Sequence, residues 1–168
     1  MGVSVALALL DLAGLVFFVL TLPACAWVAL SDLRHMKIRN AAVLMLALIF
    51  LLVGPFLLPL QLYLWQIAQG LIMLAIGFTL NMARAMGAGD AKFLAAAAPY
   101  VALQDAFAVL VLLSAMLLAA VALHRIARRI PRVVQLAPHW ESWSARKFPM
   151  GLGLGPTLSL YLALSAIG

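Results

Sequence analysis

The sequence predicts an all-α, polytopic membrane protein with about six transmembrane helices. Of its 168 residues, 67% are hydrophobic and only 10% are charged, whereas a soluble domain usually carries about 25% charged residues. The apolar residues fall into runs long enough to cross a bilayer core of about 30 Å, which takes roughly 20 helical residues. Only short loops separate these runs, so residues 1–168 are predicted to form a single transmembrane domain.

Six apolar runs are expected to be helices, because an open strand edge leaves backbone groups unsatisfied in lipid. They are Leu12–Leu30, Ala41–Leu58, Leu62–Met82, Ala91–Leu103, Ala106–Leu123 and Met150–Ile167. Asn40 and Asp105 directly precede the second and fifth runs, where their side chains would serve as N-caps. Gly54-Pro55 and Pro59 should break the chain between the second and third runs.

The fourth run is shorter than the others. Its roughly 13 residues, at about 1.5 Å each, reach only two-thirds of the way across a bilayer. Either this helix is short, or the segment 87–90 before it dips below the membrane surface. Irregular backbone at that depth is tolerated only where it is buried in protein or lines a wet cavity. A site that uses water is therefore expected here.

The basic residues predict the orientation. All eleven Lys and Arg residues lie in three alternate loops, at 31–40, 83–92 and 124–149, and the intervening loops and both ends hold none. The positive-inside rule then places these three loops in the cytoplasm and both termini on the opposite, non-cytoplasmic side. The same clustering argues against a nucleic-acid partner, which needs basic residues spread over one face.

Two of the five acidic residues, Asp32 and Asp90, lie where an apolar run meets one of these cytoplasmic loops. A carboxylate is costly near hydrocarbon, so such an acid indicates a functional site, and two of them could act together as the pair in an aspartic protease does. Alone, Asp32 could simply end a helix and Asp90 could be an N-cap. Gly87 and Gly89 favour the functional interpretation, because a cap needs neither and both allow close approach of backbone or substrate.

The segment 87–90, Gly-Ala-Gly-Asp, resembles the Gly-x-Gly-Asp signature of the type IV prepilin peptidases. The first motif of that family has an Asp followed by Ile six and Asn eight residues later, here Asp32, Ile38 and Asn40. The segment 148–151, Phe-Pro-Met-Gly, resembles the family's C-terminal Pro-x-Gly segment. These motifs occur in the family's order and on the same predicted face, and the resemblance covers nearly the whole chain.

The resemblance implies a membrane-embedded aspartic endopeptidase with Asp32 and Asp90 as catalytic residues and with no metal or other cofactor. It would remove the N-terminal leader of type IV prepilins or pseudopilins at the cytoplasmic face of a bacterial inner membrane. Longer members of the family carry an N-terminal region with paired Cys-x-x-Cys motifs, whereas this chain has one cysteine. The resemblance is therefore to the short, peptidase-only branch associated with Flp-type pili. One departure is Arg39, where the family often has Pro.

Several residues around the two acids are expected to support them. The supporting motif residues are Gly87, Gly89, Lys92, Ile38 and Asn40. Lys92 has two interpretations, a side chain that snorkels to the interface or one that orients Asp90. Pro149 and Gly151 are expected to serve packing or substrate contact. Packing is favoured for Gly151, because it forms a Gly-x-x-x-Gly pair with Gly155 that lets two helices approach closely.

Aromatic residues recur in the last basic loop. Trp140, Trp143 and Phe148 lie near helical spacing, which predicts an amphipathic stretch at the membrane interface. His124, just before them in the chain, shows no pattern that would predict a partner.

The alternative function is that of a non-enzymatic subunit for membrane transport or pilus assembly. A transport subunit that relays ions would need acids near the middle of the bilayer, and the predicted spans place none there. A pilus-assembly platform usually carries a larger cytoplasmic domain than these loops provide. The peptidase is therefore the favoured function.

In a two-aspartate mechanism one carboxylate takes a proton from water while the other, protonated, polarises the scissile carbonyl. Helix dipoles predict which is which. Asp90 precedes the fourth span, whose positive end should favour the ionised form, and Asp32 closes the first span, whose negative end should favour the protonated form. The sequence therefore predicts Asp90 as the base and Asp32 as the acid.

Overall fold

The computed structural model describes residues 2–145 and 147–167, with side chains from Leu12 onward. Every regular element in these residues is helical. The α-helices are α1 (Gly2–His35), α2 (Asn40–Leu57), α3 (Leu60–Met82), α4 (Ala88–Ala97), α5 (Ala106–Arg128), α6 (Pro131–Leu136) and α7 (Gly151–Ser165). Three short 3₁₀ turns accompany them, η1 (Ala98–Tyr100), η2 (Leu103–Asp105) and η3 (Glu141–Trp143).

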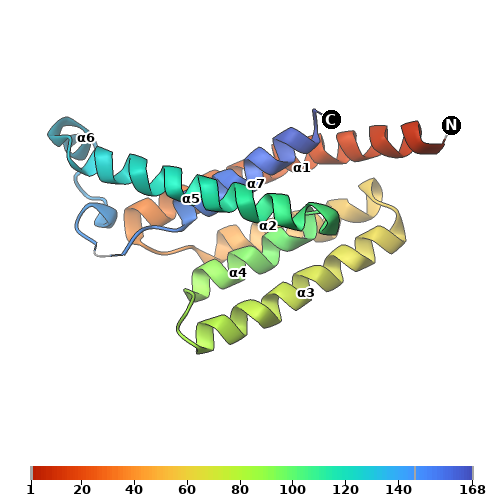
Figure 1. The fold of residues 1–168 in the computed structure, drawn as a ribbon, viewed down its shortest axis with the longest axis horizontal. Coiled ribbons are helices and arrows are strands. Elements are labelled where there is room, and N and C mark those ends of the chain that lie inside the picture. The colour runs from red at the N-terminus through yellow and green to blue at the C-terminus, as the bar shows by residue number, and fades with distance from the viewer. Residues whose placement is uncertain (1, 146, 168) are drawn as a thin grey trace.

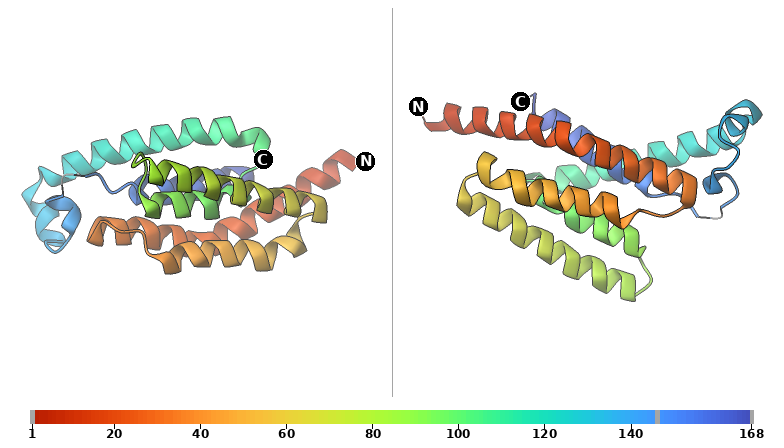
Figure 2. Two further views of the ribbon diagram at one scale, coloured as in Figure 1. Left: turned by 90° about the horizontal axis from the view of Figure 1, so that it is seen from below. Right: turned by 180° about the vertical axis from the view of Figure 1, so that it is seen from behind.

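The long helices run back and forth along the molecule's longest axis (Figures 1 and 2). Helix α7 packs along α1 and α5, while α4 packs along α3 and α2. Helix α1 begins and α7 ends at the same end of the molecule (Figure 1). The opposite end gathers the C-terminal end of α1 and the N-terminal ends of α4 and α7. Which end faces the cytoplasm stays a prediction.

The all-α membrane architecture predicted from the sequence is confirmed. Within the described residues, four helical stretches are long and apolar enough to cross a membrane: Leu12–His35, Asn40–Leu57, Leu60–Met82 and Leu103–Arg128. Helix α4 has only 10 residues, as its short apolar run predicted, and α7 has 15. The total of six crossings therefore stays a prediction, because it depends on these two shorter helices.

The predicted break at Gly54-Pro55 is wrong, because α2 continues through Pro55 and ends at Leu57. A proline inside a helix leaves the carbonyl four residues earlier without its donor. Here that carbonyl belongs to Leu51, and the hydroxyl of Tyr63 on α3 donates to it at 3.1 Å. The helix therefore tolerates Pro55, and the break falls at Pro59 alone.

The two predicted N-caps also differ from expectation. Asn40 is the first residue of α2, and Arg39 occupies the cap position without a capping hydrogen bond from its side chain. Asp105 does occupy the cap position of α5, yet its side chain makes no capping bond. Instead its carboxylate accepts a hydrogen bond of 2.9 Å from the hydroxyl of Tyr161 on α7. The Asp105 side chain therefore joins the start of α5 to α7, and the Asn40 side chain joins α2 to Lys92 on α4.

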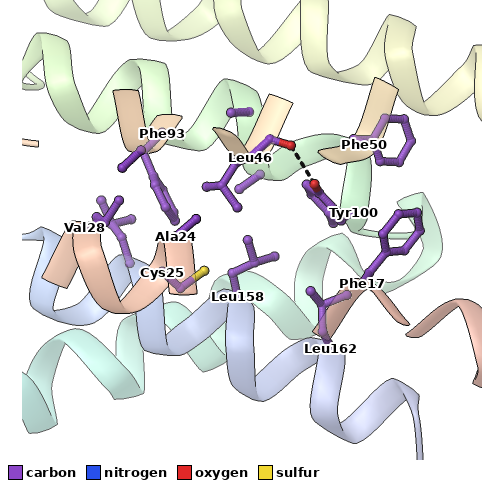
Figure 3. Close-up of a cluster of buried hydrophobic side chains, with 14 of the residues drawn as sticks. Phe17, Ala24, Cys25, Val28, Leu46, Phe50, Phe93, Tyr100, Leu158 and Leu162 are labelled. Atoms are coloured by element: carbon purple, nitrogen blue, oxygen red, sulfur yellow. Dashed lines mark hydrogen bonds between the residues drawn. The ribbon is translucent and has the colours of Figure 1, made fainter. Parts of the chain in front are cut away.

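The core lies where α1, α2, α4 and α7 meet, and Figure 3 shows its buried side chains. The ring of Tyr100 packs edge-on against Phe17 and Phe50, and its hydroxyl donates to the Leu46 carbonyl at 2.6 Å. Helices α1 and α7 approach so closely that a Cβ at Gly155 would lie 2.5 Å from the Cys25 carbonyl oxygen. This close packing, which the Gly-x-x-x-Gly pair predicted, brings the start of α7 beside the end of α1.

Candidate active site

The structure places both predicted acids in one cavity. Asp32 lies in the last turn of α1, which extends beyond the predicted helix end, and its side chain is only 6% exposed. Asp90 lies in the first turn of α4 and is half-buried. Both line a cavity of about 860 Å³ whose walls are the segments 36–38, 81–89 and 147–150. Three loops that are far apart in the sequence thus enclose the two carboxyls.

Asp32 is held by the start of α7. The backbone N–H of Gly151 donates a hydrogen bond of 2.6 Å to Asp32 Oδ2. Because a Cβ at Gly151 would lie 2.9 Å from the Asp32 Cβ, the approach requires a residue without a side chain. A hydrogen bond of this kind stabilises the ionised carboxylate. The sequence suggested packing or substrate contact for Gly151, but the structure shows contact with the aspartate itself, while Pro149 is fully buried beside it.

Asp90 folds back over the beginning of its own helix. Gly87 occupies the N-cap position of α4, and its backbone N–H interacts with the Asp90 carboxyl. A Cβ at Gly87 would lie 2.6 Å from Asp90 Oδ2, so a side chain at this position would displace the carboxyl. The contact corresponds to the N3 half of a capping box. Asp90 is therefore not the N-cap that one interpretation of the sequence expected, because Gly87 holds that position; Asp90 contacts the start of α4 from the first turn and also lines the cavity.

The surroundings of Asp90 favour its protonated form. Burial raises the pKa of Asp90 most, the negative charge of Asp32 raises it further, and the Gly87 N–H partly opposes both, so that the pKa is about 6. Two neighbouring carboxyls resist being charged together. The pair is therefore expected to keep one proton at mildly acidic pH.

The supporting motif residues join the α1–α2 connection to α4. Gly89 lies against Ile38 so closely that a Cβ at position 89 would be 3.2 Å from the Ile38 Cβ. One turn further along, Lys92 Nζ donates a hydrogen bond of 3.2 Å to Asn40 Oδ1. The exposed Lys92 does not line the cavity of the two acids. These contacts fix α4 relative to the segment that follows Asp32.

The backbone conformation near the cavity shows how Arg39 can replace the proline that is frequent in the family, and it points to two further residues of the site. Arg39 has φ of −74°, within the range that proline imposes, so the backbone that a proline would give is kept. Met36 and Arg84 both line the cavity and both have positive φ, 51° and 59°. Such strain in residues other than glycine occurs often at functional sites. Neither residue carries a sequence signal that would have revealed this conformation.

The carboxyl groups that line the cavity are those of Asp32 and Asp90. Among the described residues, no group of three or more His, Cys, Asp or Glu side chains gathers in a way that could hold a metal ion. Lys37, Arg84 and Lys147 contribute the basic part of the cavity wall. The cavity thus combines two acids with a basic rim.

Comparison with known proteins gives one match. The model of the type IV leader peptidase family matches residues 6–123. This range includes both aspartates and the segments 36–40 and 87–92, and it ends before Gly151. Neither the curated proteins nor the solved structures include a significant match to the chain.

Proposed function

The chain belongs to the type IV leader peptidase family, and from this premise we propose that it is a two-aspartate endopeptidase for prepilins. Family membership indicates that the chain is a multi-pass membrane protein and a protease of the leader-peptidase type. We assign Asp32 and Asp90 as the catalytic residues, prepilins of the Flp type or pseudopilins as substrates, and the cytoplasmic face of the inner membrane as the place of cleavage.

One observation carries this proposal: two carboxyls in one cavity have different surroundings. Asp32 accepts a short hydrogen bond from the Gly151 N–H, which offsets part of the cost of burying its charge, and the pKa of Asp90 is raised to about 6 by burial and by the charge of Asp32. An acid and a base are distinguished in this way when the environment moves two titratable groups apart. A transport or assembly subunit would have no need of this asymmetry.

The asymmetry suggests a role for each residue. Asp32, ionised and held by Gly151, would accept a proton from the attacking water. Asp90, protonated, would donate a hydrogen bond to the scissile carbonyl oxygen and stabilise the negative charge that develops there. When the tetrahedral intermediate collapses, the proton taken by Asp32 passes to the leaving amine. The pair titrates as a unit, so one proton shared between two sites is the active state.

These roles reverse the ones that helix dipoles predict. A dipole contributes only about 0.3–1 kcal/mol at an exposed site, whereas a hydrogen bond to a charged group contributes about 1.5–3 kcal/mol. Helix α1 also continues past Asp32 to His35, so its negative end lies beyond the carboxyl. The Gly151 contact at Asp32 and the negative charge that Asp32 places beside Asp90 therefore outweigh the dipoles.

The position of the cavity agrees with a substrate that is part polar and part apolar. It lies at the ends of α1, α4 and α7, between loops that carry Lys37, Arg84 and Lys147. A hydrophilic leader could occupy the loops while the apolar helix that follows it stays in the bilayer. The basic loops support the cytoplasmic side by the positive-inside rule.

Co-expression with a Flp-type prepilin tests the proposed function. We expect the prepilin to lose a short N-terminal segment, seen as faster migration in gels and as a new N-terminus by mass spectrometry. Full-length prepilin in the presence of stably accumulated protein would contradict the proposal and favour a non-enzymatic subunit.

Cleavage is expected to slow as the pH rises through about 6, the raised pKa of Asp90. Below that pH Asp90 keeps the proton with which it polarises the carbonyl, and above it both carboxyls become charged. Because kcat/KM reports the ionisation of the free enzyme, initial rates at low substrate concentration across the pH range provide the measurement. A kcat/KM that increases through this range would contradict the proton assignment.

A further inference from the structure

An aromatic cluster lies behind the segment that leads into α7. The ring of His124, in the last turns of α5, stacks on Trp143 at a centroid distance of 5.2 Å. It also meets Phe148 edge-on at 5.9 Å, and Trp140 stacks on Trp143 at 5.5 Å. His124 is only 6% exposed. The loop that the sequence assigned to the membrane interface is thus packed around a buried histidine.

The imidazole of His124 contributes to this cluster by ring–ring packing. Within the described residues, the buried Nε2 of His124 has no hydrogen-bond partner. Its contacts with Trp143 and Phe148 are instead ring against ring, an arrangement that contributes about 0.5–1.5 kcal/mol per pair beyond the burial of area. An aromatic ring without nitrogen should therefore serve the same contacts.

The cluster is anchored on the side away from the acids. Trp143 Nε1 donates a hydrogen bond of 2.9 Å to the Ala137 carbonyl. Ser142 beside it is fully buried, and η3 packs against α1. The ring that supports His124 is therefore fixed to the body of the protein and can transmit its position to the next contact.

On its other side the cluster reaches the candidate active site. Phe148 contacts His124 and also lines the cavity of the two acids. The fully buried Pro149 follows, and two residues later the Gly151 N–H bonds to Asp32. A short, partly buried connection thus runs from the aromatic cluster to the carboxyl of Asp32.

A second path confirms that the cluster lies directly behind this hydrogen bond. His124 and Trp143 line a separate cavity of about 420 Å³ together with Leu33 and Leu152. Leu33 follows Asp32 in α1, and Leu152 follows Gly151 in α7. Both partners of the hydrogen bond are therefore next in sequence to residues that face the cluster.

From these contacts we propose that His124 is a positioning residue of the peptidase. By packing between Trp143, on which it stacks, and Phe148, which it meets edge-on, it holds the segment 148–151 so that the Gly151 N–H stays on Asp32 and Phe148 forms a fixed wall of the substrate cavity. The proposal rests on the two-aspartate function proposed above. His124 lies just beyond the residues that the family model matches.

The test compares His124→Ala with His124→Phe in the full-length protein, purified in detergent and given a prepilin substrate. We expect His124→Ala to lower kcat about 10- to 100-fold, the cost of a catalytic group displaced by a fraction of an ångström to one ångström. At low pH the rate should fall as Asp32, the base, becomes protonated. Loss of the Gly151 hydrogen bond should move this acidic limb of the pH–rate profile to higher pH, because the bond favours the ionised form of Asp32. His124→Phe should restore both properties.

The matched control is His139→Ala, since His139 is an exposed histidine in the turn after α6 and should keep the wild-type profile. Thermal unfolding of each variant separates lost positioning from lost folding. An unchanged kcat and pH profile in a folded His124→Ala variant would overturn the proposal. So would a folded His124→Phe variant as defective as His124→Ala, because the imidazole would then be required for its nitrogen atoms.

Infrared spectroscopy tests the positioning without cleavage. In an Asp90→Asn background with labelled aspartate, the Asp32 carboxylate band should shift toward that of a carboxylate without a hydrogen bond when His124→Ala is added, and not when His124→Phe is added. A band that stays in place overturns the positioning proposal alone. Absence of cleavage by the wild-type protein would instead count against the proposed function, while this spectroscopic result would still decide the role of His124.

Discussion

Asp32→Asn and Asp90→Asn are each expected to abolish leader cleavage, while the protein still accumulates in the membrane. An amide at position 32 removes the base that accepts the proton of water, and an amide at position 90 removes the proton that polarises the scissile carbonyl. When two residues act as a catalytic unit, removing one costs about as much activity as removing both. Each single variant should therefore be nearly as inactive as the double variant, about 10⁴-fold or more below wild type. The measurement is the fraction of co-expressed prepilin that keeps its leader.

Asp105→Asn serves as the control for this experiment. Its carboxylate also accepts a hydrogen bond between helices, from the Tyr161 hydroxyl, and an amide oxygen can accept the same bond. We expect normal cleavage by this variant. Asp11→Asn should also be active, although the side chain of Asp11 lies outside the described residues. Full activity in Asp32→Asn or Asp90→Asn would exclude the two-aspartate mechanism.

The sequence predicted the helices well and their ends less well. Apolar runs are a strong signal because every residue of a span contributes to the run. The short α4 could therefore be predicted from the length of its apolar run. The end of α2 depends on one tertiary contact, the Tyr63 hydroxyl that replaces the N–H missing at Pro55. No local pattern records such a contact, and the proline rule alone therefore gave the wrong boundary.

The same distinction applies to the candidate site. The two aspartates were paired from their motifs and from the loop charges, and the structure places them in one cavity. The hydrogen bond between Gly151 and Asp32 joins residues 119 positions apart, and the stacking of His124 on Trp143 depends on how a loop folds back on α5. The proposed roles of the two acids rest on the Gly151 contact, so they differ from the roles that helix dipoles alone predict.

Gly151→Ala is expected to reduce kcat by at least about 10²-fold, the cost of losing one preorganised hydrogen-bond donor in an active site. The added Cβ would lie 2.9 Å from the Asp32 Cβ, 3.0 Å from Oδ2 and 3.2 Å from Val28 Cγ1. Two of these atoms belong to the carboxyl residue itself, so the start of α7 has to move away from α1. The N–H is then withdrawn from Asp32, and the pair loses the interaction that makes its two members unequal.

Gly153→Ala is the matched control, because it makes the same chemical change two residues later in α7. A Cβ there would meet Leu117 on α5, 2.5 Å from Cδ2, 3.1 Å from Cγ and 3.3 Å from Cα, so the leucine side chain has to rotate and α5 has to give by a few tenths of an ångström, but none of these atoms belongs to Asp32. Alanine also favours a helix over glycine by about 1 kcal/mol, so this variant should fold and cleave. Steady-state kinetics of both variants, with circular dichroism to verify folding, separate the two effects. If Gly151→Ala kept the wild-type kcat, the Gly151 N–H would have no part in catalysis, and the assignment of Asp32 as the base would lose its structural support.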